Sequence, residues 1–337
     1  MKLEPSGSGR AAMGTRQGKD GRAAQNEEAP APIQREAPFA SALLALGQRR
    51  ADVVVLSADL AKYTDVMPFA QAFPERFFQV GMAEANMMGI AGGLAKSGYL
   101  PIPVTYGVFA TRRAYDQVAM ALATGPSRAI IVAFLPGITT PFRATHQAID
   151  DLALMRALPG IAVVDPADAT ELGAALDAAA EHDGTVYMRG QRGLVPQLFE
   201  PDGFRFRLGA VRTLLDGGDV ALVGTGLGTQ WALEAAAVLR ERGLDASLLH
   251  MPTLKPVDAD AIAEFCAPFE VVTTVENHSV VGGLAATVAA ALTSAGIGTR
   301  IRALGARDAW APAGTLPYIR HELGLDATAI ALAAERT

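Results

Sequence analysis

One carboxylate, Glu84, stands in an otherwise apolar stretch of this 337-residue sequence. The stretch reads VGMAEANMMGIAGG, where a run typical of a strand gives way to a pattern typical of a helix. Burying an ionised carboxylate there is costly unless it is protonated or bound to a specific partner. Glu84 is therefore a candidate catalytic group. The alternative is an acid that only faces the positive end of a helix dipole.

Two aromatic residues, Tyr106 and Phe109, follow at the end of the next expected strand. Rings at such a place usually belong to a core, but at the carboxyl end of a parallel strand they can also stack on a flat heteroaromatic ligand. Arg112 and Arg113 come one turn later. We expect these arginines either to contact an anionic group or to face solvent.

A loop that reads FRATHQAIDD places Arg143 and His146 just before an expected helix. A histidine beside an arginine in a loop is a candidate substrate contact. The alternative is that the loop only caps the helix through Thr145. Further along, VENHSVVGG brings Glu276 and His278 together, but this spacing suits no standard metal site, so we expect loop or interface chemistry.

A glycine-rich turn, VGTGLGTQ, lacks the full G-x-G-x-x-G spacing of a dinucleotide site. We therefore interpret it as a tight turn from strand to helix.

From residue 38 onward, short apolar strands alternate with helices, which predicts an α/β fold with two doubly wound domains. One of the expected helices covers residues 108–124. The expected domains are 38–195 and 218–337, joined by a Pro-, Asp- and Gly-rich linker at 196–217. Strands are expected in ADVVVLSADL, FFQVG, YLPIPVTY, RAIIVAFLPG, IAVVD, TVYMRGQRG, DVALVG, DASLLH, EVVTTV and TRIRALGA, with Glu276 and His278 in the loop after EVVTTV.

Residues 1–37 hold no aromatic side chain before Phe39 and are rich in Gly, Ala, Glu, Arg, Gln and Pro, so we expect this segment to be disordered. Its composition fits neither a signal peptide nor a transit peptide. The net charge of −6 argues against nucleic-acid binding, and no apolar run is long enough to span a membrane. A single cysteine, Cys266, excludes a disulfide framework and a thiolate metal cluster and fits a cytoplasmic protein.

Taken together, these motifs resemble the thiamine-diphosphate enzymes of the transketolase family. The resemblance covers nearly everything after residue 37 and implies a pyrimidine-binding domain followed by a transketolase C-terminal domain. It also extends to deoxyxylulose-phosphate synthase, a member of the same superfamily. The segments that carry it are VGMAEANMMGIAGGLA, YGVFATRRAYDQV, THQAIDDLALMRALPGIAVVDPADATE and VENHSVVGG.

The resemblance implies a cofactor site on this chain. Glu84 matches the catalytic glutamate that hydrogen-bonds N1′ of the aminopyrimidine and promotes proton removal from the thiazolium. Phe109 matches the ring that stacks on the aminopyrimidine, and Tyr106 the ring that precedes it. Asp59 matches an aspartate near the cofactor. Arg112 stands where many transketolases have a third aromatic residue and where the deoxyxylulose-phosphate branch has an arginine.

The resemblance also implies substrate contacts. His146 matches a histidine that contacts the sugar hydroxyls near the reacting carbons, which makes it a second catalytic candidate. Arg189 matches an arginine that holds the sugar phosphate. Arg143 is an additional cation for an anionic group, together with Lys62. Among these residues the resemblance implies no metal ligand.

Three positions depart from the family pattern. Phe142 replaces an aspartate that reads a donor hydroxyl, Phe134 replaces a phosphate-contacting histidine, and Tyr63 replaces a phosphate-contacting serine. A site that loses polar contacts of this kind is expected to change its specificity strongly. We therefore expect substrates other than the common ketose phosphates.

No G-D-G followed by the asparagine that binds diphosphate and Mg²⁺ occurs in the sequence. The resemblance therefore implies one subunit of a split transketolase, which transfers a two-carbon ketol unit from a ketose or ketose phosphate to an aldose. A partner subunit, the N-terminal half, would hold Mg²⁺ and the diphosphate of thiamine diphosphate. We expect a heterotetramer with two copies of each chain.

Other functions remain open at this point. One is the beta subunit of a 2-oxoacid dehydrogenase, which has the same two-domain layout and also needs a partner. Another is an enzyme similar to deoxyxylulose-phosphate synthase. The last is a non-catalytic paralogue that only binds its partner, although the joint presence of Glu84 and Phe109 argues against such decay.

Overall fold

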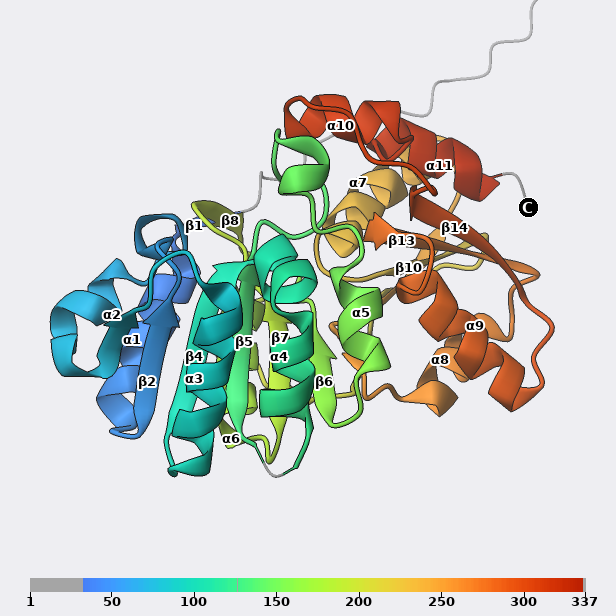
Figure 1. Ribbon diagram of the computed structural model, residues 1–337. Helices are drawn as coiled ribbons and strands as arrows, with labels where there is room; N and C mark the ends of the chain where they lie inside the picture. The colour runs from blue at the N-terminus through green and yellow to red at the C-terminus, as the bar shows by residue number, and fades with distance from the viewer. Residues whose placement is uncertain (1–32, 126, 336–337) are drawn as a thin grey trace, which may run out of the picture. The chain divides into compact units, whose positions relative to one another are not determined.

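The computed structural model describes residues 33–125 and 127–335 (Figure 1). Most of the predicted disordered extension, residues 1–32, lies outside this part of the chain. Its last residues contradict the prediction, because β1 (Gln34–Glu36) pairs antiparallel with β8 (Leu194–Pro196). The composition of the segment could not reveal the distant strand that supplies its hydrogen-bond partners. Among the described residues, no helix combines the length and apolar character needed to cross a bilayer.

The first sheet has seven strands in the order β12-β6-β7-β5-β4-β2-β3. All neighbours are parallel except β12, which runs antiparallel to β6. This arrangement confirms the predicted α/β class with parallel sheets. The strands are β2 (Val53–Ser57), β3 (Phe77–Gln79), β4 (Leu100–Tyr106), β5 (Ala129–Phe134), β6 (Ile161–Val164), β7 (Thr185–Arg189) and β12 (Thr253–Lys255).

Helices cover both faces of this sheet because its strands are apolar on both sides. On β5, Ile130 and Val132 join the cluster that α1 and α6 complete, whereas Ile131 and Ala133 join the cluster that α3 and α5 complete. In Figure 1, α3, α4 and α5 lie in front of the sheet and α6 lies behind it. The helices are α1 (Pro38–Arg49), α2 (Met67–Ala72), α3 (Glu84–Lys96), α4 (Tyr115–Gln117), α5 (Asp151–Ala157) and α6 (Ala169–Glu181).

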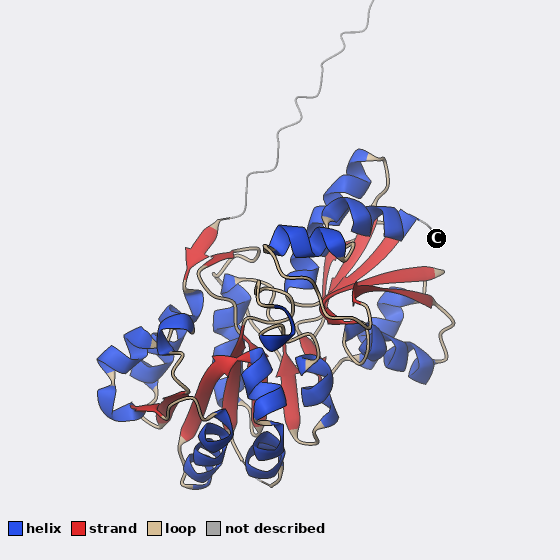
Figure 2. Cartoon of the chain, turned by 45° about the horizontal axis from the view of Figure 1, so that its top comes forward, coloured by secondary structure: helices blue, strands red, loops and turns tan. Residues whose placement is uncertain are grey.

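The second sheet has five strands in the order β14-β13-β10-β11-β9, of which only β9 is antiparallel to its neighbour. Figure 2 shows helices on both sides of each group of strands. The strands are β9 (Arg212–Leu215), β10 (Val220–Gly224), β11 (Ala246–His250), β13 (Val271–Ser279) and β14 (Arg300–Ala306). The helices are α7 (Leu227–Glu241), α8 (Ala259–Cys266), α9 (Leu284–Ala295), α10 (Leu316–Glu322) and α11 (Ala327–Glu335).

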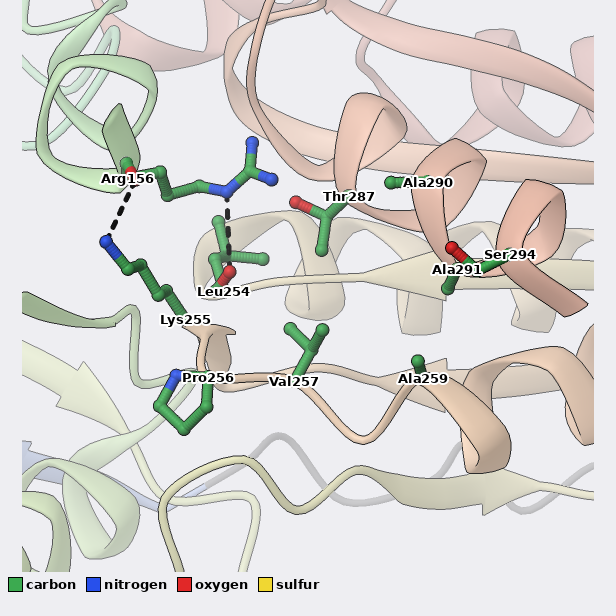
Figure 3. Close-up of a pocket in the computed structure, with 10 residues that line it drawn as sticks. All are labelled: Arg156, Leu254, Lys255, Pro256, Val257, Ala259, Thr287, Ala290, Ala291 and Ser294. Atoms are coloured by element: carbon green, nitrogen blue, oxygen red, sulfur yellow. Dashed lines mark hydrogen bonds between the residues drawn. The ribbon is translucent and has the colours of Figure 1, made fainter. Parts of the chain in front are cut away.

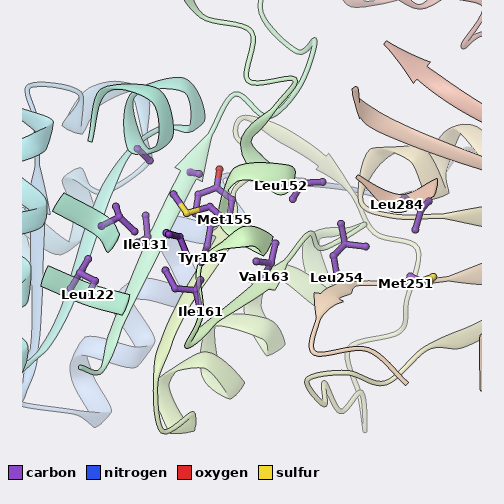
Figure 4. Close-up of a cluster of buried hydrophobic side chains, with 14 of the residues drawn as sticks. Leu122, Ile131, Leu152, Met155, Ile161, Val163, Tyr187, Met251, Leu254 and Leu284 are labelled. Atoms are coloured by element: carbon purple, nitrogen blue, oxygen red, sulfur yellow. The ribbon is translucent and has the colours of Figure 1, made fainter. Parts of the chain in front are cut away.

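One strand of the C-terminal half, β12, belongs to the first sheet rather than the second. It pairs with β6 through Thr253 and Lys255. The apolar core continues across this junction, because Met155 and Val163 belong to the same buried cluster as Leu254 (Figure 4). The two halves of the chain therefore share one strand pairing and one core.

The helix predicted over residues 108–124 is only partly correct. The segment consists of a π-helical stretch, Phe109–Arg113, then α4, then a second π-helical stretch, Val118–Ala123. A π-helix has a wider turn than an α-helix and occurs often at functional sites. The apolar pattern identified a helical segment but could not identify the hydrogen-bond register.

Candidate active site

Four aromatic rings meet at the carboxyl edge of the first sheet. Tyr106 ends β4, and its ring lies 5.9 Å from the ring of Phe109, with an angle of 27° between the planes. The imidazole of His146 stands edge-on to Phe109 at 5.4 Å and to Tyr106 at 6.3 Å. Phe142, which is 61 % exposed, packs on His146 at 5.1 Å. The structure thus brings together the two predicted ring residues and two of the predicted substrate contacts.

Glu84 is the first residue of α3, directly after the turn that follows β3. Gly81 allows this turn with a φ of 76°, a value that favours glycine. The Glu84 side chain is only 2 % exposed, and its carboxylate accepts two contacts of 2.9 Å from one nitrogen of Arg113. Glu84 therefore has both features that the sequence left open, namely a helix N-terminal position and a specific partner.

Arg113 links Glu84 to the rings. Its guanidinium carbon lies 4.1 Å from the centre of the Phe109 ring while its nitrogen contacts Glu84. From the sequence we expected Arg112 and Arg113 either to contact an anionic group or to face solvent, with no difference between the two residues. The structure makes Arg113 the residue of this pair that reaches the buried acid.

His146 lies in a loop that follows the short 3-10 turn Arg143–Thr145. Burial, and secondly the positive charge of Arg113, lower the pKa of His146 below its ordinary value. The imidazole Nδ1 lies 2.9 Å from Oγ1 of Thr145. Thr145 does not cap α5, because its hydroxyl contacts the carbonyl oxygen of Phe142 and no side chain caps that helix. The capping alternative for this loop is therefore wrong.

Arg112 has a different role from the predicted cofactor contact. Its guanidinium donates to the carboxylate of Asp150 at 2.9 Å and to the carbonyl oxygens of Ala144 and Gln147 at 2.8 and 2.5 Å. It also stacks on Trp310 at 4.7 Å. These contacts commit Arg112 to holding the His146 loop, so we correct its assignment from cofactor binding to loop anchoring.

Arg189 also contradicts its predicted role as a phosphate contact. It is 1 % exposed at the end of β7 and forms ion pairs with Asp151 at 2.5 Å and with Asp165 at 3.1 Å. Further hydrogen bonds reach the carbonyl oxygens of Asn277 and Ala148. The strand position alone did not show that two acids from other segments enclose it. Its donors hold the protein together and leave none for a substrate.

The remaining predicted positions divide into exposed and buried ones. Asp59 and Arg143 are exposed, with φ values of 62° and 54°, and their side chains do not contact the rings. Tyr63 is 50 % exposed, with the guanidinium of Arg192 5.9 Å from its ring. Phe134 is fully buried and packs edge-on against Phe39, so its ring offers no surface to a substrate. Lys62 is exposed beside Tyr63.

Backbone strain gathers around this edge of the sheet. Asp59 follows β2 and Leu135 follows β5, and both have positive φ, at 62° and 53°. Arg143 adds a third such residue in the His146 loop. Strained residues of this kind persist where the surroundings hold them and are frequent at functional sites. They support the assignment of the site to this edge.

The predicted interface role of VENHSVVGG has a concrete basis. The Asn277 side chain accepts a hydrogen bond from the amide of Ile138 at 2.9 Å and donates to the carbonyl oxygen of Pro136 at 3.0 Å. His278 donates from Nδ1 to its neighbour's carbonyl and accepts from the amide of Ala153 in α5 at 3.4 Å. Glu276 caps the first turn of α9. The motif therefore ties the second sheet to both ends of the His146 loop.

We also searched the described residues for other pockets and for metal sites. A cavity of about 360 Å³ between β12 and α9 holds Arg156 and Lys255 (Figure 3). Both cations already donate to backbone carbonyl oxygens, Arg156 to those of Leu254 and Gly283 and Lys255 to that of Arg156. Within residues 33–125 and 127–335, no group of three or more acidic, histidine or cysteine side chains is arranged to hold a metal ion.

Comparison with protein-family models gives two matches. Residues 32–197 match the transketolase pyrimidine-binding domain, and residues 209–330 match the transketolase C-terminal domain. The chain is 45 % identical over 298 residues to a transketolase family protein of Sinorhizobium fredii. The alignment covers 88 % of this chain and 86 % of that protein.

Two further relatives have similar lengths. The chain is 36 % identical over 297 residues to a 6-deoxy-6-sulfo-D-fructose transketolase subunit of a Clostridium species, covering 88 % of this chain and 92 % of that one. Among solved structures, a split-gene transketolase, an inactive β4 tetramer, matches with a TM-score of 0.79 at 39 % identity. That match covers 89 % of this chain and 96 % of the other.

Proposed function

The chain belongs to the transketolase family, and from that premise we propose that it is the pyrimidine-binding subunit of a split transketolase. The proposed reaction moves a two-carbon ketol unit from a ketose or ketose phosphate to an aldose acceptor. The observation that carries the proposal is the buried Glu84 carboxylate, which Arg113 links to the Phe109 ring, with the ring of Tyr106 stacked beside Phe109.

The residues of the site fit the pyrimidine half of thiamine diphosphate. A flat aminopyrimidine suits the rings of Tyr106 and Phe109, and a ring nitrogen suits the carboxylate of Glu84. Bound there, the cofactor would supply the nucleophilic carbon and the electron sink that ketol transfer needs. We assign its diphosphate and Mg²⁺ to a partner subunit, because the sequence holds no G-D-G followed by the asparagine that binds them in the family.

Glu84 would hold a proton at the pyrimidine nitrogen, and its near-complete burial would keep water away from that proton. Phe109 and Tyr106 would fix the plane of the ring. His146 would contact a sugar hydroxyl as a neutral imidazole, because burial and the charge of Arg113 lower its pKa. Arg143, exposed in the same loop, and Phe142 would contact the rest of the sugar.

Partner dependence follows from the same division of the cofactor site. Support comes from relatives of matching length that are named as a transketolase subunit and as a split-gene transketolase. We propose an assembly with two copies of this chain and two of a partner that carries the diphosphate site.

The test is a mixing experiment. This chain, an N-terminal-half partner subunit, thiamine diphosphate and Mg²⁺ are combined, and two-carbon transfer between a ketose and an aldose is measured. We expect transfer only when both chains are present. Transfer by this chain alone would contradict the need for a partner. Decarboxylation of a 2-oxoacid without ketol transfer would favour the dehydrogenase or deoxyxylulose-phosphate-synthase type of function instead.

A further inference from the structure

Arg113 makes two contacts that the proposed function assigns to the cofactor. One nitrogen of its guanidinium lies 2.9 Å from each oxygen of Glu84, and the guanidinium carbon lies 4.1 Å from the centre of the Phe109 ring. The guanidinium is planar and donates hydrogen bonds to the carboxylate. An aminopyrimidine is planar as well, and its ring nitrogen donates to the carboxylate when it carries the proton that it shares with Glu84. Arg113 and the pyrimidine would therefore use the same carboxylate, that of Glu84, and the same ring, that of Phe109.

The two partners exclude each other. An aminopyrimidine that stacks on Phe109 and reaches the Glu84 carboxylate needs the volume and the acceptor that the guanidinium uses. Glu84 is buried to 2 % exposure, so its carboxylate offers little room for a second partner. Arg113 must leave Glu84 before the pyrimidine can bind.

The contact is built so that Arg113 can leave. The Arg113 side chain is 49 % exposed, and Glu84 is its one ion-pair partner among the described residues. Its neighbour Arg112 is held by Asp150 and two carbonyl oxygens instead. Arg113 is also the last residue of a π-helical stretch, and the next residue, Ala114, departs from helical geometry with φ −120° and ψ 12°. A half-exposed arginine at a helix discontinuity can turn to solvent at modest cost.

We propose that Arg113 is a built-in competitor of the cofactor's pyrimidine: it occupies the pyrimidine position while the site is free and determines how tightly that position binds. The competitor also satisfies the Glu84 carboxylate, which would otherwise be buried without a partner. This inference rests on the proposed function for the identity of the ligand.

The test uses the full chain and a neutral probe, 4-amino-5-hydroxymethyl-2-methylpyrimidine, the aminopyrimidine half of thiamine. A neutral probe removes the direct repulsion between Arg113 and the positively charged thiazolium. Binding to the wild-type chain and to Arg113→Ala is followed by NMR titration. Arg49→Ala is the matched control, because it removes an exposed ion pair with Asp177 on the same domain.

We expect Arg113→Ala to bind the probe about tenfold more tightly, a factor that corresponds to about 1.4 kcal/mol. Added salt should tighten wild-type binding by weakening the Glu84–Arg113 pair, and it should leave the Arg113→Ala chain unaffected. Arg113→Met, which keeps most of the side-chain volume, replaces the alanine variant if the latter does not fold.

Equal or weaker binding by the Arg113 variants, including no detectable binding at the highest probe concentration, would overturn the proposal. The titration involves no turnover, so its outcome is independent of whether the assembled enzyme transfers a ketol unit. Failure of the proposed function would instead appear as a complex that lacks this transfer although its chains are intact.

Discussion

Replacing Arg189 with methionine tests whether this arginine is part of the structure or of the substrate site. The variant leaves Asp151 and Asp165 buried without their cation, at side-chain exposures of 0 and 4 %. Removing one partner of a buried ion pair costs about 3–5 kcal/mol. Asp151 keeps the hydroxyl of Tyr187 at 2.6 Å, which compensates for only part of the loss. We therefore expect the free energy of unfolding to fall by about 3–5 kcal/mol.

The assay is urea denaturation followed by circular dichroism, with Arg49→Met as the matched control. Arg49 pairs with Asp177 on the surface, both side chains being 54 % exposed, so its removal should cost under about 1 kcal/mol. A loss below about 1 kcal/mol for Arg189→Met, together with a raised KM for a sugar phosphate, would refute the reasoning and restore the substrate role.

The deficit of Arg189→Met should also depend on pH. In the wild type, burial acts to raise the pKa of Asp151, but the attraction of Arg189 outweighs it and lowers that pKa. Asp151 thus stabilises the folded state above its ordinary pKa and loses this contribution as the pH falls. Burial raises the pKa of Asp165, so this residue acts in the opposite direction. Without Arg189 both acids favour protonation, and the deficit should shrink on acidification towards pH 4.

Two further predictions concern the His146 loop. Proton NMR titration of the imidazole should give His146 a pKa below its ordinary value. Arg113→Ala should move this pKa part of the way back, because burial remains while the nearby cation is lost. An unchanged titration midpoint of His146 in the variant would place Arg113 away from His146. Asn277→Ala should lower the free energy of unfolding by about 1–3 kcal/mol and speed amide exchange over residues 136–146, because it leaves the amide of Ile138 and the carbonyl of Pro136 unpaired. The control variant Asn86→Ala, at an exposed position, should change neither quantity. Equal behaviour of the two variants would argue against the role of Asn277 in holding the loop.

Much of the fold could be predicted because its signals are local. Strands that are apolar on both faces alternate with helices, and this pattern already requires a parallel sheet covered on both sides. The family resemblance was confirmed by family models that match residues 32–197 and 209–330. The pairing of β12 with β6 was not predictable, because it joins Thr253 to Val164 across nearly ninety residues. The predicted domain boundaries stay predictions.

The location of the site could be predicted from residue types and strand ends. The roles of its arginines could not, because they depend on which acids the arginines contact. Tyr106 ends β4, and Phe109 follows it. Glu84 and His146 come after the carboxyl ends of β3 and β5 in the same parallel sheet, so the topology collects all four residues at one edge. The roles assigned to them stay predictions until they are measured.

The arginines were harder to assign, because an arginine takes its role from the acid it meets. Arg189 meets two buried acids that come from other segments. Arg112 and Arg113 diverge to Asp150 and Glu84 within a π-helical stretch that no sequence pattern revealed. Spacing along the chain could not separate them.

The central claim is that Glu84 handles the proton at the pyrimidine of the cofactor, and its most direct measurement is ketol transfer by the assembled complex carrying Glu84→Gln. Glutamine keeps the size and polarity of the side chain but removes the carboxylate, so we expect kcat to fall by at least about 100-fold. Assembly with the partner should be retained, and Arg49→Gln, on the distant surface pair, should keep full activity. A Glu84→Gln complex that transfers ketol units at the wild-type rate would contradict the account.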